Sequence, residues 1–414
     1  MTEQKNLVSK RRFKEFPNTH AWEQRKLGEM SNSFEYGLNA SATFFDGINK
    51  YIRITDIDDN SRLFNQSALT SPNVDLSNAD NYLIKNGDIL FARTGASVGK
   101  TYRYQESDGK VYYAGFLIRA RINQDFDSEF VFQNTLTPKY DNFIKITSQR
   151  SGQPGVNAQE YASFDLMVPT LEEQQKIGTF FKALDGTIAL HQRKLEKTKA
   201  LKSAYLSEMF PAEGEREPKR RFAGFTHAWE QRKLGEVADI IGGGTPSTSS
   251  QEYWDGDIDW YSPVEIGEQT YVDSSQKKIT AIGLQKSSAK ILPIGTVLFT
   301  SRAGIGNTAI LAKEGATNQG FQSIVPHKDE LDSYFIYSRT HELKRYGETN
   351  GAGSTFVEVS GKQMAKMPML IPALEEQKKI GGFFERLDHL IAFHQRKLEK
   401  LQNIKKAYLN EMFI

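Results

Sequence analysis

Three glycine-containing segments have residue types and spacings that could support catalysis. Residues 95–101, GASVGKT, approach a phosphate-binding P-loop, but three residues separate the two glycines where that loop needs four. Residues 304–309, GIGNTA, match a dinucleotide-binding pattern. The residues that follow, 102–104 and 309–311, have strand character, so neither segment offers the helix N-terminus that would bind phosphate. Residues 108–110, Asp-Gly-Lys, could belong to a nuclease site, but Asp-Gly between strands first predicts a hairpin turn.

Other kinds of catalysis lack the residues that they need. The chain has no cysteine, which excludes disulfides, cysteine-ligated zinc and thiol catalysis. Its seven histidines show no metal-binding spacing, and no two prolines are adjacent, so the Asn/Asp-Pro-Pro-aromatic motif of amino-methyltransferases is absent. We therefore expect a binding protein that itself holds no metal and no cofactor. A stand-alone nuclease or NTPase is the alternative, and nuclease activity of the isolated chain would support it.

Polar loops in both halves of the chain could bind DNA. Two of them are equivalent tight loops that each follow a strand, at 93–100 and 301–307, and their small residues allow close backbone approach. Arginine can fork onto phosphate or guanine, and asparagine and glutamine read adenine. The candidate DNA-binding residues are Arg93, Thr94, Lys100, Arg150, Ser151, Gln153, Arg302, Asn307, Asn318 and Gln319. For any one of them ordinary loop chemistry is the simpler explanation; their occurrence in both halves is what favours the set.

The composition indicates a globular chain with more than one domain. Hydrophobic residues make up 38% and charged residues 25% of the 414 residues, and 26 Phe, 17 Tyr and 4 Trp can fill several cores. The net charge of +2 is too small for a protein that coats DNA, so any DNA contact must come from local patches or be shared with a partner. The first residues lack an apolar signal segment, and the apolar stretch 367–374 is interrupted by prolines. We expect a cytoplasmic protein without membrane contact.

The elements that must position the loops are duplicated. Residues 20–29, HAWEQRKLGE, recur unchanged at 227–236, and residues 171–178 match 374–381 closely. Between these repeats the two halves differ strongly in sequence. The order is therefore a variable region, a constant stretch, a second variable region and a second constant stretch.

Each constant stretch predicts a long helix with an apolar seam. Apolar residues recur alternately every four and three positions, and no proline interrupts them. The predicted helix-pairing seam consists of Ile177, Phe181, Leu184, Ile188, Leu195, Ile380, Phe384, Leu387, Ile391 and Leu398. Such a stripe either pairs with the other copy, antiparallel, or packs on its own domain. His191 and His394 lie on the seam, where they either fix the register or serve as a metal or switch site. Thr170 and Glu173 predict a capping box at the start of the first helix.

The variable regions predict compact, loop-rich α+β domains. Short apolar runs at 88–92, 110–113, 296–300 and 309–311 have strand character, and a short helix is expected around 333–345. The predicted fold is α+β: two pseudo-symmetric α+β domains joined by two long helices that pair as an antiparallel coiled coil. The predicted parts are a first domain at 11–168, a central helix at 169–210, a linker at 211–226, a second domain at 227–371 and a C-terminal helix at 372–414.

This order of parts resembles the specificity subunit of type I restriction-modification systems. The resemblance rests on WEQRKLGE at 22–29 and 229–236, on the helix starts at 169–174 and 372–377, and on TNQGFQ at 317–322. It covers nearly the whole chain. Its duplicated layout is specific, whereas each short motif alone is not.

The resemblance implies a function and a set of partners. Each variable region would be a target recognition domain that reads one half of a split, asymmetric sequence in double-stranded DNA, and the paired helices would set the unread gap. Two methyltransferase subunits that carry S-adenosylmethionine would dock on the chain, and two restriction subunits would add translocation and cleavage with ATP and Mg²⁺. The chain itself would be a non-catalytic subunit of the DNA adenine methyltransferase and endonuclease complex. The alternative is a structural adaptor that holds two enzyme subunits without reading DNA.

Overall fold

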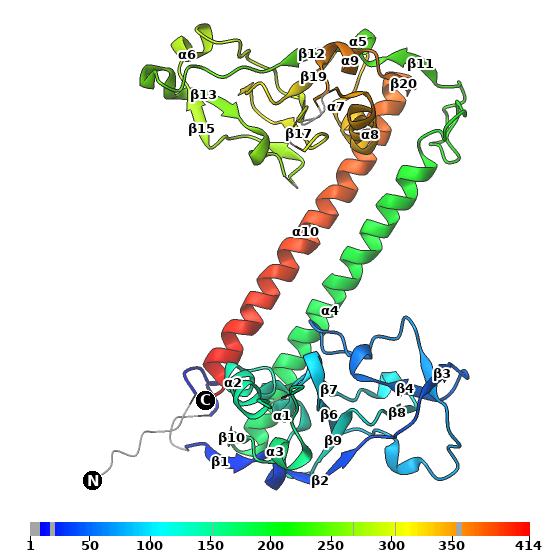
Figure 1. The fold of residues 1–414 in the computed structure, drawn as a ribbon, viewed down its shortest axis with the longest axis vertical. Helices are drawn as coiled ribbons and strands as arrows, with labels where there is room; N and C mark the ends of the chain where they lie inside the picture. The colour runs from blue at the N-terminus through cyan, green and yellow to red at the C-terminus, as the bar shows by residue number, and fades with distance from the viewer. Residues whose placement is uncertain (1–8, 17–20, 151, 268, 303, 353–357) are drawn as a thin grey trace. The chain divides into compact units, whose positions relative to one another are not determined.

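The computed structural model describes residues 9–16, 21–150, 152–267, 269–302, 304–352 and 358–414 (Figure 1). The chain divides into two compact units. Unit 1 comprises residues 1–193 and 395–414, and unit 2 comprises residues 194–394. Each of the two long helices, α4 (Leu171–Glu208) and α10 (Leu374–Met412), contributes one end to each unit.

The central sheet of unit 1 has four antiparallel strands, in the order β2 (Ser31–Tyr36), β9 (Leu117–Ile122), β6 (Asp88–Ala92) and β7 (Thr101–Arg103). Strand β6 is buried throughout, and its side chains alternate between two cores. Ile89 and Phe91 pack on one face, whereas Leu90 and Ala92 pack on the other. Burial on both faces explains why the apolar run of this strand is continuous.

Smaller elements surround the sheet of unit 1. Two-stranded sheets are formed by β1 (Glu23–Lys26) with β10 (Asp165–Val168), β3 (Ala42–Phe44) with β5 (Thr70–Pro72), and β4 (Lys50–Ile52) with β8 (Val111–Tyr113). Helices α1 (Ser128–Asn134), α2 (Pro138–Thr147) and α3 (Ala158–Ala162) begin at Asp127, Thr137 and Asn157, whose side chains accept backbone N–H groups of the first turn. Short 3₁₀ turns are η1 (Leu27–Met30), η2 (Ile54–Asp56), η3 (Asp80–Tyr82), η4 (Gly95–Ser97) and η5 (Glu106–Asp108).

Unit 2 repeats this plan with additions. Its main sheet has the order β12 (Ala238–Gly242), β19 (Gln322–Pro326), β16 (Val297–Phe299), β17 (Thr308–Leu311) and β14 (Tyr271–Val272). Further sheets are β15 (Lys277–Ile279), β13 (Trp254–Tyr261) and β18 (Ala316–Thr317), and the pair β11 (Glu230–Lys233) with β20 (Pro368–Ile371). The helices are α5 (Leu234–Val237), α6 (Ala281–Gln285), α7 (Ser333–Ser338), α8 (Thr340–Asn350) and α9 (Gly361–Ala365), and the 3₁₀ turns are η6 (Gln251–Tyr253) and η7 (Pro263–Glu265).

Within each unit the two long helices pack antiparallel, which confirms the predicted fold class. In unit 1, the ring centroids of Phe180 and Tyr408 are 5.0 Å apart, and Lys405 lies 2.7 Å from Asp185. In unit 2, the contacts between the sequence-equivalent residues are Tyr205 with Phe383 at 4.9 Å and Lys202 with Asp388 at 2.5 Å. Along these contacts, the residue numbers increase on one helix as they decrease on the other, as antiparallel pairing requires.

The predicted seam packs in both of the ways that the sequence left open. Ile177 and Phe181 belong to the core of unit 1, and that core also contains Leu409, Met412 and Phe413 from the end of α10. In unit 2, Met209 and Phe210 from the end of α4 share a core with Ile380, Phe384 and Leu387. Leu195 is also buried, whereas Leu184, Ile188, Ile391 and Leu398 are half-buried. The apolar stripe of each long helix therefore packs both against its own domain and against the other long helix.

Several local expectations were confirmed and others were wrong. Strands occur at each predicted run, as β6, β8, β16 and β17. The helix expected around 333–345 is divided into α7 and α8. The hairpin turn expected at 108–110 is wrong, because β7 pairs with β6 and β8 pairs with β4. Asp108 is instead buried and accepts hydrogen bonds from Tyr102 and Gln66.

Other elements lie at the ends of the long helices. The carboxylate of Glu173, expected in a capping box with Thr170, accepts two hydrogen bonds of 2.6 Å from Arg12. Residues 211–226 contain turns and irregular structure. In the parts of the chain that the structure describes, no helix is long and apolar enough to cross a membrane.

Candidate nucleic-acid interface

The two candidate loops leave equivalent strands of the two units. The loop of unit 1 follows β6, which lies between β9 and β7, and the loop of unit 2 follows β16, which lies between β19 and β17. Both loops turn on glycines in the left-handed region, Gly95 (φ +73°) in unit 1 and Gly306 (φ +97°) in unit 2. The duplicated frame therefore presents both loops from the same place in its fold.

Arg93, at the start of the loop in unit 1, contacts two aromatic rings. Its guanidinium carbon lies 5.1 Å from the ring centroid of Tyr36 and 5.9 Å from that of Phe116. Its backbone N–H donates to the carbonyl of Phe116 (3.0 Å), and its own carbonyl accepts from Val156 (2.9 Å). The Nε atom is buried and, among the described residues, has no hydrogen-bond partner. These two cation–π contacts restrict the orientations that the guanidinium can adopt.

A cavity of about 640 Å³ lies beside Arg93. Both aromatic residues that flank Arg93 also line it, and both are exposed, Tyr36 by 44% and Phe116 by 57%. Arg53 lines it as well, but its guanidinium forms two hydrogen bonds to Asp56, of 2.8 and 2.9 Å. The cavity therefore offers aromatic surface, backbone groups and the guanidinium of Arg93.

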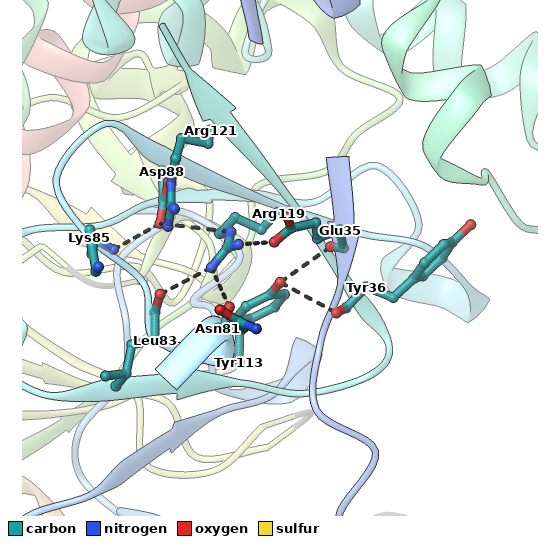
Figure 2. A network of polar contacts seen from close by, with 9 residues as sticks. All are labelled: Glu35, Tyr36, Asn81, Leu83, Lys85, Asp88, Tyr113, Arg119 and Arg121. Carbon is teal, nitrogen blue, oxygen red and sulfur yellow. Dashed lines mark hydrogen bonds and ion pairs between the residues drawn. The ribbon is translucent and has the colours of Figure 1, made fainter. Parts of the chain in front are cut away.

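A buried polar network fixes the strand end that carries Tyr36 (Figure 2). Arg119 donates to the backbone carbonyls of Asn81 (2.7 Å) and Leu83 (3.1 Å) and pairs with the carboxylate of Glu35. The hydroxyl of Tyr113 is directed at the carbonyls of Glu35 and Tyr36, at 3.4 and 3.3 Å.

A second charged pair of the same network joins β9 to β6 (Figure 2). Arg121 forms two hydrogen bonds, of 2.8 and 2.9 Å, to the buried carboxylate of Asp88, and these bonds raise the pKa of Arg121. Burial raises the pKa of Tyr113, which therefore stays a neutral donor at physiological pH. Together these contacts hold the backbone from which Tyr36 projects.

The structure brings a second predicted segment beside Arg93. Thr94 forms an isolated β-bridge with Gly155, and the N–H of Gly95 donates to the carbonyl of Pro154 at 3.0 Å. Gln153 is exposed, and a side chain at position 95 would come within 2.9 Å of its Nε2 atom. Arg93, Thr94 and Gln153 are therefore neighbours, although 58 or more positions separate Gln153 from the others in the chain.

Two candidates of unit 1 are engaged elsewhere, and one is not described. Lys100 is buried, where its ammonium donates to the carbonyl of Ile57 and pairs with Asp59 at 2.5 Å. Arg150 donates to the carbonyls of Thr147 and Gln149 and pairs with Glu160, so it covers the C-terminal end of α2. Both side chains therefore form contacts within the domain rather than pointing freely from its loops. Ser151 lies outside the described residues.

In unit 2 the structure brings together three of the four candidates. Arg302, Asn307 and Asn318 line one cavity of about 420 Å³. The nearest oxygen of Glu358 lies 3.8 Å from Arg302, too far for a hydrogen bond. Gln319 is exposed beside this cavity and accepts a hydrogen bond from the hydroxyl of Thr245. Val264, at the cavity edge, is 88% exposed.

The sequence pattern did not reveal the aromatic residues beside Arg93. Tyr36 and Phe116 lie far from Arg93 along the chain, and they meet it because β2, β9 and β6 are adjacent in the sheet. One signal for the network was present: Arg119 and Arg121 alternate with apolar residues in LIRARI at 117–122. Charged residues in a strand of this kind need carboxylate partners when they are buried.

The fold and these loops define a duplicated α+β protein that presents two related but chemically different polar surfaces. In the part of the chain that the structure describes, no group of three or more histidines and carboxylates could hold a metal ion. The chain matches the family model of the type I restriction modification DNA specificity domain twice, at residues 20–200 and 227–403. It therefore belongs to the family of type I restriction-modification specificity subunits, which are in general non-catalytic.

Individual relatives agree with this family. The specificity subunit of the type I restriction enzyme MjaIX from Methanocaldococcus jannaschii is 34% identical over 189 residues, which is 45% of this chain and 44% of that subunit. This chain thus matches less than half the length of the MjaIX subunit. The HindI specificity subunit of Haemophilus influenzae is 22% identical over 88% of this chain and 94% of its own length. The crystal structure of a type I S subunit from M. genitalium has the same fold, with a TM-score of 0.65 at 13% identity over 98% of this chain and 99% of that one.

Proposed function

We propose that this chain reads a bipartite, asymmetric DNA target, with one half-site for each recognition domain. The observation that carries the proposal is the presence of different side chains on equivalent loops of a duplicated frame. Unit 1 offers Arg93 in contact with two aromatic rings, whereas unit 2 offers Arg302 with two asparagines. Side chains of these types recognise base edges in the major groove. Two different readers imply two different half-sites.

In this proposal the chain acts with enzymatic partners. It docks two methyltransferase subunits, which use S-adenosylmethionine, and two restriction subunits, which use ATP and Mg²⁺; this chain binds none of these cofactors. The net charge of +2 supports the view that the partner subunits provide part of the contact with DNA phosphates. A protein that binds many phosphates by itself would need a strongly basic surface. In this proposal the complex acts on DNA in the cytoplasm.

The proposal is tested by exchange of one variable region. Residues 30–168 are replaced by the corresponding region of another specificity subunit, and the chain is co-expressed with its methyltransferase subunit in a host that lacks other adenine methylation. Methylome sequencing should show one new half-site and one retained half-site. Exchange of residues 237–371 is the matched control and should change the other half.

Two results would contradict the proposal. A change in both half-sites, or in neither, would show that the domains do not read separately. An unchanged methylated motif after both exchanges would favour the structural adaptor, which holds enzyme subunits without reading DNA.

A further inference from the structure

Arg93 has no carboxylate partner, a property that it shares with Arg62 and Arg193 among the described arginines of unit 1, but it is the one of these three whose Nε atom is buried without a hydrogen-bond partner. The structure pairs the following arginines of this unit with Asp or Glu: Arg11, Arg12, Arg25, Arg53, Arg103, Arg119, Arg121 and Arg150. No ion pair or side-chain hydrogen bond of Arg93 occurs among the described residues, and its Nε atom is buried without a partner. An ordered but unsatisfied guanidinium in a cavity wall is a group prepared for a ligand.

The surroundings of Arg93 define the shape of that ligand. Tyr36 and Phe116 both contact the guanidinium and its Nε atom is buried, so the edge formed by the two terminal amino groups is the part left for binding. That edge presents parallel donors that match two acceptors in one plane. In double-stranded DNA, the O6 and N7 atoms of guanine are such a pair.

A phosphate would need a different kind of site. Phosphate sites gather several cations, but the other cation that lines this cavity, Arg53, is already bound to Asp56. The polar residues next to Arg93 are the uncharged Thr94 and Gln153, and Asn39 lines the same cavity. Uncharged amides and hydroxyls beside one arginine are typical of base reading rather than of backbone binding.

We propose that Arg93 reads a guanine in the half-site of the first recognition domain, through two hydrogen bonds to O6 and N7. Tyr36 and Phe116 hold the guanidinium in the plane of that base, and the network around Arg119 positions Tyr36. This inference rests on the proposed function, since it names one base contact of the same DNA-reading surface.

The test uses the complex of the full chain with its methyltransferase subunits and a duplex that contains the methylated motif. Each guanine of the motif is replaced in turn by 7-deazaguanine, which lacks the N7 acceptor. At one guanine of one half-site, this replacement should weaken binding of the wild-type complex about tenfold, within the range of a bidentate contact. The Arg93→Ala variant should bind the unmodified duplex roughly 10- to 100-fold more weakly and should be insensitive to 7-deazaguanine at that position.

Matched variants separate base reading from other roles. Arg93→Lys keeps the positive charge but loses the planar fork, so it should lose the same discrimination while the thermal unfolding midpoint is retained. Arg302→Ala should leave sensitivity to 7-deazaguanine in the first half-site unchanged. Tyr36→Ala removes one of the two rings that contact the guanidinium and should reduce the discrimination.

The outcomes distinguish this inference from the proposed function. An equal loss on every sequence, with a shallower dependence on salt, would make Arg93 a phosphate contact and overturn the proposal. Unchanged binding and methylation by the Arg93 variants would also overturn the proposal that Arg93 reads a guanine. The proposed function would still stand in that case, because the wild-type complex would methylate a bipartite motif. If the wild-type complex methylates no bipartite motif at all, the proposed function fails first.

Discussion

Phe413, at the end of the chain, should be essential to the stability of unit 1. Its ring lies 5.4 Å from Phe130 and 5.6 Å from Phe181, and it is 8% exposed. Truncation of a buried phenylalanine to alanine removes about 3–5 kcal/mol of unfolding free energy. Phe413 keeps a small exposed fraction, so for Phe413→Ala we expect the lower end of this range, about 3 kcal/mol.

Trp22 provides a reporter for this unit. It is the single tryptophan of unit 1 in the sequence, and its ring lies 6.0 Å from Phe130, which itself contacts Phe413. The protein is labelled with 5-fluorotryptophan, and urea unfolding is followed by ¹⁹F NMR. With a slope of about 2–3 kcal/mol per molar urea, the Trp22 midpoint should fall by about 1–1.5 M.

The matched control is Phe210→Ala at the symmetry-related position of unit 2. Phe210 contacts Phe335, Phe384 and Trp229, so this variant should lower the Trp229 midpoint more than that of Trp22. Phe413→Ala should give the reverse pattern. An unchanged Trp22 midpoint in Phe413→Ala would refute the assignment of the chain end to the core of unit 1.

Two further predictions concern charged groups. Burial raises the pKa of Asp127, the N-cap of α1, so ionisation of this carboxyl group opposes folding. The protonated carboxyl group contributes stability to the folded protein below the unfolded pKa of about 4. That contribution is lost as pH rises through the higher pKa of the folded state. Asp127→Asn keeps an N-cap, so it should gain stability over wild type as pH rises above about 4 in Trp22-detected unfolding, and a constant difference across this range would contradict the argument. Arg12→Leu leaves the buried carboxylate of Glu173 without that partner and should lower the unfolding free energy by about 3 kcal/mol. The double variant Arg12→Leu/Glu173→Leu removes the charge as well, so its unfolding free energy should fall by less. Equal losses in the two variants would show that the uncompensated charge is not the cause.

The sequence predicted the elements that depend on pattern and repetition. The four-and-three spacing from Ile177 onward gave both long helices, and the apolar runs located strands such as β6 and β16. The two strand-end loops followed from these assignments. Such features are local in sequence or are copied between the halves, so no knowledge of tertiary contacts was needed to find them.

What the sequence could not predict depends on contacts between distant residues. Lys100 resembles a free cation in sequence, yet its contact with Asp59 requires the path of the chain around η2. The turn chemistry of Asp-Gly at 108–109 indicated a hairpin, but β8 pairs with β4, more than 50 residues earlier. Tyr36 and Phe116 become partners of Arg93 through strand order alone.

The placement of the last helical turn has a consequence for synthesis of the protein. The core of unit 1 includes Leu409, Met412 and Phe413, so the N-terminal domain lacks part of its interior until these residues, which follow the whole second domain, have been synthesised. Unit 2 comprises residues 194–394. The part of its core that comes from the end of α4 is synthesised before the rest of that domain. Domains usually complete folding in the order in which they leave the ribosome. In this protein the domain that emerges first is completed after the second one, and a ribosome that stops before codon 409 releases a chain whose first domain has an open core.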